Sequence, residues 1–115
     1  MSRNAYRVIR IITAKNPTFN MSYDEELVSI LEESANIFDS LNSYGNGIFD
    51  ILEDEFKEVK EKIEELIDGL ESTKTNKPEN KEKAKCYRKV LAEMERVIKK
   101  EGYISYQIYW EYKSD

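Results

Sequence analysis

The spacing of the apolar residues changes at Gly102, and this change constrains the fold more than any other feature of the chain. Before Gly102 the apolar residues recur at helical spacing, whereas after it they alternate with more polar positions. Alternation with a period of two is typical of a half-buried β-strand. The apolar face of this strand is formed by Ile104, Tyr106, Ile108, Trp110 and Tyr112. We therefore expect helices that pack on a small sheet, with Gly102 ending the last helix.

Three helices are predicted upstream of Gly102. Ser22-Tyr-Asp-Glu25 is a capping box, which predicts a first helix that runs to about residue 41. The segment 42–47 is rich in Asn and Gly and is expected to be a turn. A second helix is indicated by the nearly heptad spacing of Leu52, Phe56, Val59, Ile63, Leu66 and Leu70. A polar loop over 72–80 then leads to a third helix over about 81–101.

The N-terminal residues 3–14 fit two structures. Their many β-branched residues favour a strand, but some of their apolar residues also fit a helical stripe. With a strand here, the chain is a single α+β domain over residues 1–115. In that domain, a three-helix antiparallel bundle packs against a small antiparallel sheet formed by the N- and C-terminal segments. With a helix here, the alternative is an all-α bundle with a C-terminal β extension.

Composition excludes several kinds of chemistry. The chain has no histidine and a single cysteine, which rules out Ser-His-Asp and Cys-His catalysis and the common zinc sites. We therefore expect no enzymatic activity, no cofactor and no metal. No stretch of the sequence reaches the roughly 18–20 apolar residues that a membrane span needs. We expect a cytoplasmic protein without a membrane partner.

One cluster of carboxylates is similar to metal-binding clusters in a family of enzymes. Glu61-x-x-Glu64, with Glu65 and Asp68, resembles in outline the clusters that hold magnesium in all-α nucleotide pyrophosphatases. Those families add a second acidic motif on a following helix, but the third helix here offers only Glu93 and Glu95 among basic residues. A magnesium-dependent pyrophosphatase is therefore the second alternative function.

Charge is sorted along the sequence. Residues 50–71 have a net charge of −7, and residues 72–100 have a net charge of +6. Opposite charges on neighbouring helices joined by a short loop predict an antiparallel helical hairpin. The whole chain is acidic, with a net charge of −5, so we do not expect direct contact with nucleic acid.

The leading hypothesis is a non-catalytic protein that binds and regulates another protein. A small, acidic chain of this composition fits an inhibitor or accessory factor of a bacterium, plasmid or phage. Aromatic side chains on a strand and a row of carboxylates on a helix are the expected contact surfaces. The predicted partner-binding residues are Tyr103, Tyr109, Trp110, Glu58, Glu61, Glu65 and Asp68.

Two other modes of interaction follow from the same surfaces. Rows of carboxylates can imitate a phosphate backbone, so the first alternative is a nucleic-acid mimic that inhibits a DNA- or RNA-handling enzyme. Pairing of an edge strand or of the helical stripes between two copies is a route to a homodimer.

Overall fold

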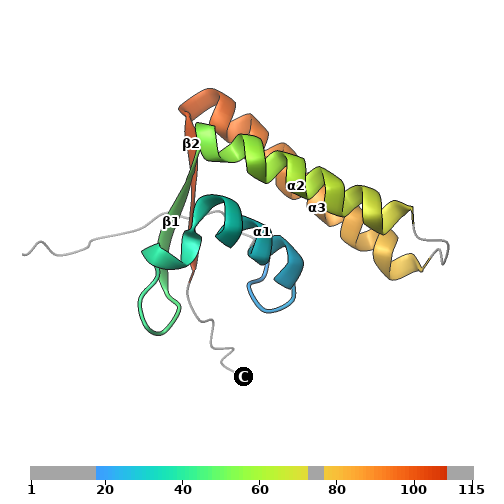
Figure 1. Cartoon of the computed structure of the whole chain (residues 1–115), viewed down its shortest axis with the longest axis horizontal. Coiled ribbons are helices and arrows are strands. Elements are labelled where there is room, and N and C mark those ends of the chain that lie inside the picture. Colours follow the sequence, from blue (N-terminus) through green and yellow to red (C-terminus); the bar gives the residue numbers. More distant parts are fainter. Residues whose placement is uncertain (1–17, 73–76, 109–115) are drawn as a thin grey trace, which may run out of the picture.

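The computed structural model describes residues 18–72 and 77–108, which form an α+β fold. Two long helices lie side by side and are joined at one end to a two-stranded antiparallel sheet (Figure 1). A shorter helix lies in the angle between this sheet and the helical pair. This arrangement confirms the predicted fold class. In chain order the elements are α1 (Glu25–Ala35), the 3-10 helix η1 (Ile37–Ser40), β1 (Gly47–Leu52), α2 (Glu53–Glu71), α3 (Pro78–Glu101) and β2 (Tyr103–Ile108).

Helices α2 and α3 form the predicted antiparallel hairpin. Pro78 occupies the first turn of α3, where a backbone N–H has no intrahelical acceptor and its absence breaks no hydrogen bond. This helix therefore includes Pro78 and begins slightly earlier than predicted. Gly102 ends α3 in the left-handed conformation, with φ of 86°, and its N–H donates to the carbonyl of Ile98. The helices bury their apolar stripes against each other. The buried residues are Phe56, Val59, Ile63 and Ile67 on α2, and Ala84, Tyr87, Val90, Leu91, Met94 and Ile98 on α3.

The strand that pairs with β2 in the described residues is β1, which was not predicted. Its first residue, Gly47, belongs to the predicted turn, and its last residue, Leu52, belongs to the predicted stripe of the second helix. Phe49 lies opposite Tyr106, and Ile51 lies opposite Ile104, on the buried face of the sheet. Strand β1 passes into α2 without a loop, so Leu52 ends the strand and also caps the helix. Residues 3–14, the predicted N-terminal strand, lie outside the described residues.

Helix α1 differs from its prediction at both ends. It ends at Ala35 instead of about residue 41, because Asn36 adopts the left-handed conformation and a 3-10 turn follows. The predicted capping box is not formed. Instead, Asp24 is the N-cap residue and its carboxylate accepts a hydrogen bond from the Asn20 N–H at 2.7 Å. The Asn20 side chain in turn accepts from the Ser22 N–H at 2.8 Å, so an asparagine turn precedes the helix.

A single hydrophobic core joins all the elements. Leu27 and Leu31 of α1 are fully buried between the helical pair and the inner face of the sheet. Phe49 and Ile51 of β1 and Ile104 of β2 close the core from the other side. The two-stranded sheet would be marginal alone, and it is stabilised because one face packs on helices.

Gly47 is needed where the chain enters β1. Its φ is 153°, and a Cβ atom built there would lie 2.7 Å from the carbonyl oxygen of Ser40. We expect Gly47→Ala to lower the free energy of unfolding by about 1–3 kcal/mol, because the backbone must shift to remove this clash.

Gly69 is the matched control, since it lies within α2 and a Cβ there meets nothing within 4 Å. Gly69→Ala should stabilise the protein by about 0.5–1 kcal/mol. Urea unfolding followed by circular dichroism measures both effects. Equal stabilities for the two variants would contradict this account of the turn.

Candidate interaction surface

Four of the predicted partner-binding residues form one exposed row on α2. Glu58, Glu61, Glu65 and Asp68 are spaced by three, four and three residues, which places them on one side of the helix. All four are exposed, whereas the buried residues of α2 lie on its opposite side. We call this row the acidic stripe.

Two of the three lysines of α2 form ion pairs at the two borders of the helix. Lys60 contacts Glu95 of α3 at 3.0 Å, which raises the pKa of the lysine through the hydrogen bond. Lys62 contacts Glu33 of α1 at 3.2 Å and Glu58 at 3.3 Å, and its pKa is raised by the hydrogen bonds to these two carboxylates. These exposed ion pairs position side chains and contribute little to stability.

The charge sorting is only partly reflected in ion pairs between α2 and α3. Arg88 of α3 pairs with Glu71 of α2, as the opposite charges of the two helices predict. The pair of Lys60 with Glu95 has the reverse polarity, because the cation comes from the acidic helix. Among the described residues, no ion pair engages Glu61, Glu65 or Asp68. Three of the four carboxylates of the acidic stripe are therefore exposed and have no ion-pair partner in this part of the chain.

The solvent-facing side of the sheet lies next to the start of α2. It consists of Ile48, Asp50 and Leu52 from β1 and of Tyr103, Ser105 and Gln107 from β2, and we call it the outer sheet face. Three of these residues are large, apolar and about half exposed: Ile48 at 47%, Leu52 at 48% and Tyr103 at 46%. The Glu55 side chain accepts a hydrogen bond from the Leu52 N–H, which fixes the junction between the face and the helix.

The predicted aromatic residues have different outcomes. Tyr103 lies opposite Leu52 on the outer sheet face and is exposed, whereas Tyr109 and Trp110 lie outside the described residues. Ile48 and Leu52 were not predicted as surface residues, because Ile48 fell between the predicted turn and the second helix, and Leu52 was placed on the apolar stripe of that helix. Residues 48–52, Ile-Phe-Asp-Ile-Leu, are apolar on both faces of the strand apart from Asp50, so the sequence offered no alternation that would show which of them face solvent.

Tyr106 shows the opposite orientation and belongs to the core side of β2. Its ring packs edge-on against Phe19, with ring centroids 5.1 Å apart, and also contacts Phe49. Its hydroxyl donates to a Glu93 carboxylate oxygen at 3.3 Å, and that oxygen also accepts from the Thr18 hydroxyl at 2.9 Å. Burial raises the pKa of Tyr106, and the nearby Glu93 carboxylate raises it further.

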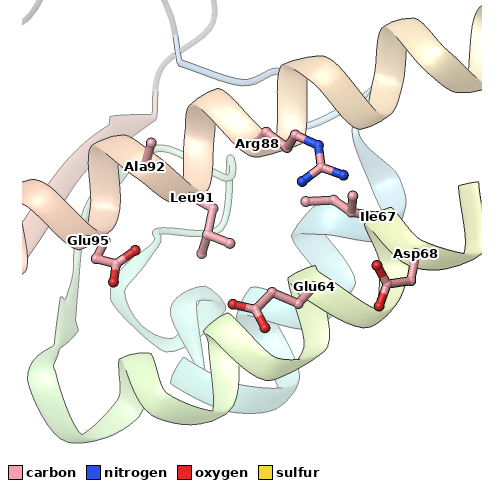
Figure 2. Close-up of a pocket in the computed structure, with 7 residues that line it drawn as sticks. All are labelled: Glu64, Ile67, Asp68, Arg88, Leu91, Ala92 and Glu95. Carbon is pink, nitrogen blue, oxygen red and sulfur yellow. The ribbon is translucent and has the colours of Figure 1, made fainter. Parts of the chain in front are cut away.

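A shallow groove of about 430 Å³ runs between α2 and α3. Figure 2 shows Glu64 and Asp68 on its α2 wall and Arg88 and Leu91 on its α3 wall. Glu64 and Asp68 line the groove, whereas Glu61 and Glu65 do not, so the predicted carboxylate cluster is divided between two surfaces. No group of three or more carboxylate or cysteine side chains in residues 18–72 and 77–108 is arranged to hold a metal ion.

The described helices include none that is long and apolar enough to cross a membrane. The fold and surface define a small α+β protein with an acidic helix beside a partly apolar sheet face. Comparisons with protein-family models, with curated proteins and with solved structures found no match to this chain.

Tyr87 gives the fold a predicted dependence on alkaline pH. Its hydroxyl donates to the Asp24 carboxylate at 3.3 Å, linking α3 to the start of α1. Burial and the Asp24 carboxylate raise the pKa of Tyr87 to about 12. Because the folded-state pKa lies above the ordinary value of about 10, this stabilisation is complete below pH 10 and is lost as the pH rises toward 12.

We therefore expect Tyr87→Phe to reduce the fall in unfolding free energy between pH 10 and pH 12. Denaturant titrations across this range measure the effect. Tyr23→Phe, at an exposed tyrosine, controls for the loss of a phenol. An identical pH dependence in wild type and Tyr87→Phe would show that Tyr87 ionisation is not coupled to folding.

Proposed function

We propose that this protein is a non-catalytic binding protein that docks onto another protein and regulates it, as an inhibitor or accessory factor. The observation that carries the proposal is the placement of the acidic stripe on the same helix that begins at the outer sheet face. Leu52, which is exposed on that face, directly precedes α2. Charged and apolar contacts are thus available on one connected part of the molecule.

The two surfaces support different aspects of binding. Half-exposed aromatic and aliphatic side chains such as Tyr103 and Leu52 supply apolar area that a partner can bury, which is the usual source of binding free energy. The carboxylates of the acidic stripe attract a basic partner over longer distances and select its orientation. A partner with a basic surface beside an apolar patch is expected.

Mimicry of a nucleic acid is the alternative, and the charge of α2 is the observation that favours it. This helix has nine carboxylates and three lysines, a net charge of −6. Successive members of the acidic stripe lie about 4.5 or 6 Å apart along the helix axis, because they are three or four residues apart. Phosphates of one DNA strand recur about every 3.4 Å along the duplex axis, so the stripe is a sparser row of charges. Protein docking that also uses apolar contacts is therefore the leading proposal.

Capture of partners from a nuclease-treated lysate of the host tests the proposal. We expect one stoichiometric protein to be retained at high salt by the wild-type chain, since apolar contacts are not screened. Glu61→Gln/Glu65→Gln should slow its association several-fold, and Tyr103→Ala should speed its dissociation. Surface plasmon resonance with the captured protein separates the two rates.

Glu79→Gln/Glu82→Gln is the matched control, because it removes the same charge from exposed positions on α3. Equal kinetics for the wild type, Glu61→Gln/Glu65→Gln and Tyr103→Ala would contradict the proposed surface. A nucleic-acid-processing enzyme that is released by salt or by competing DNA would instead support mimicry.

A further inference from the structure

The outer sheet face has a regular arrangement of apolar and charged residues. Leu52 and Tyr103 lie directly opposite each other at one end, and Ile48 lies at the other end beside Gln107. Asp50 lies midway between Ile48 and Leu52 on the same strand. Ile48 and Leu52 are four residues apart, which corresponds to about 13 Å along β1. The face thus presents one carboxylate between two apolar ends.

Asp50 is held in position but is not neutralised by the described residues. The Ser105 hydroxyl, directly across the sheet, donates a hydrogen bond to the Asp50 carboxylate. No ion pair in residues 18–72 or 77–108 involves Asp50, and neither strand contains a lysine or arginine. Along the chain, the basic residue nearest to β1 is Lys57 of α2, and the basic residue nearest to β2 is Lys100 of α3. An exposed, oriented carboxylate among apolar side chains is suited to a cation from a partner.

A second copy of this chain fits the face poorly. Two copies stacked face to face about a two-fold axis would bring the Asp50 carboxylates near each other. Each chain also has a net charge of −5, so the two acidic helices add further repulsion. The face therefore favours an occupant that is positively charged and apolar.

We propose that the outer sheet face docks an amphipathic helix of a partner protein, with Lys or Arg placed between two aliphatic residues. The inference rests on the proposed function and specifies its partner. A helix satisfies its own backbone hydrogen bonds, so it can lie on a sheet face without pairing with a strand. Its positions i, i+4 and i+8 span about 12 Å, which matches the distance from Ile48 to Leu52. Helix α1 already covers the other face, so docking completes a sheet with a helix on each side.

The test uses two helical peptides and the full-length chain. Both peptides have leucine at positions i and i+8, and they differ only in having Lys or Glu at position i+4. Titration into the 15N-labelled protein, followed by NMR, measures affinity and location together. We expect the Lys peptide to bind at least about threefold more tightly than the Glu peptide, with amide shifts centred on residues 48–52 and 103–105.

Charge reversal at Asp50 isolates the charged contact. Asp50→Lys should invert the preference, so that the Glu peptide binds more tightly. Leu52→Ser should weaken both peptides alike. Glu82→Lys, an equal charge change on α3, should leave the preference unchanged, and circular dichroism shows whether each variant is folded. If Asp50→Lys fails to fold, Asp50→Asn replaces it, and this variant should abolish the preference.

Several results would overturn the inference. These are the absence of binding, equal affinity for the two peptides, or shifts centred away from the outer sheet face. Shifts in residues 3–14 caused by Asp50→Lys without peptide would assign the face to the basic N-terminal segment of the chain instead. A captured partner that binds Asp50→Lys as tightly as wild type would overturn this inference alone, whereas the absence of any partner would overturn the proposed function.

Discussion

The fold depends on one junction, at which the sheet meets the helical hairpin on both chain segments. Strand β1 passes directly into α2 at Leu52 and Glu53, and α3 passes into β2 through Gly102. The two junctions are joined, because the Glu53 N–H donates to the Gly102 carbonyl at 3.1 Å and Leu52 pairs with Tyr103. The sheet and the helical hairpin are therefore two halves of one long antiparallel hairpin (Figure 1). Helix α1 fills the angle between them and completes the core.

Local sequence signals predicted the transition from α3 to β2 but missed the transition from β1 to α2. The helical stripes of α2 and α3 and the glycine stop at Gly102 were predictable, because they depend on spacing within one segment and on the backbone preference of glycine. Strand β1 was not predicted. Its six residues form a strand through pairing with β2, whose nearest paired residue, Tyr103, is 51 positions from Leu52. Leu52 also fitted the apolar stripe of α2, which favoured an earlier helix start.

The candidate surface was predictable to a similar extent. The exposure of Glu58, Glu61, Glu65 and Asp68 follows from helical spacing once the buried face of α2 is known. The exposure of Ile48 and Leu52 could be predicted only if β1 was known to be a strand paired with β2. No local pattern in the sequence therefore placed these residues beside Tyr103. Charge sorting predicted the neighbouring helices but not the individual ion pairs, since Lys60 pairs with Glu95 against the net charges of the two helices.

We infer that the junction makes the sheet and the helical hairpin one cooperative unit, which holds the outer sheet face in a fixed shape for binding. Native-state hydrogen exchange of the isolated protein tests this cooperativity directly. We expect the most protected amides of β1 and β2 to open with the same free energy as those of α2 and α3. Exchange of the strands through a separate opening of much lower free energy, with the helices still protected, would contradict it.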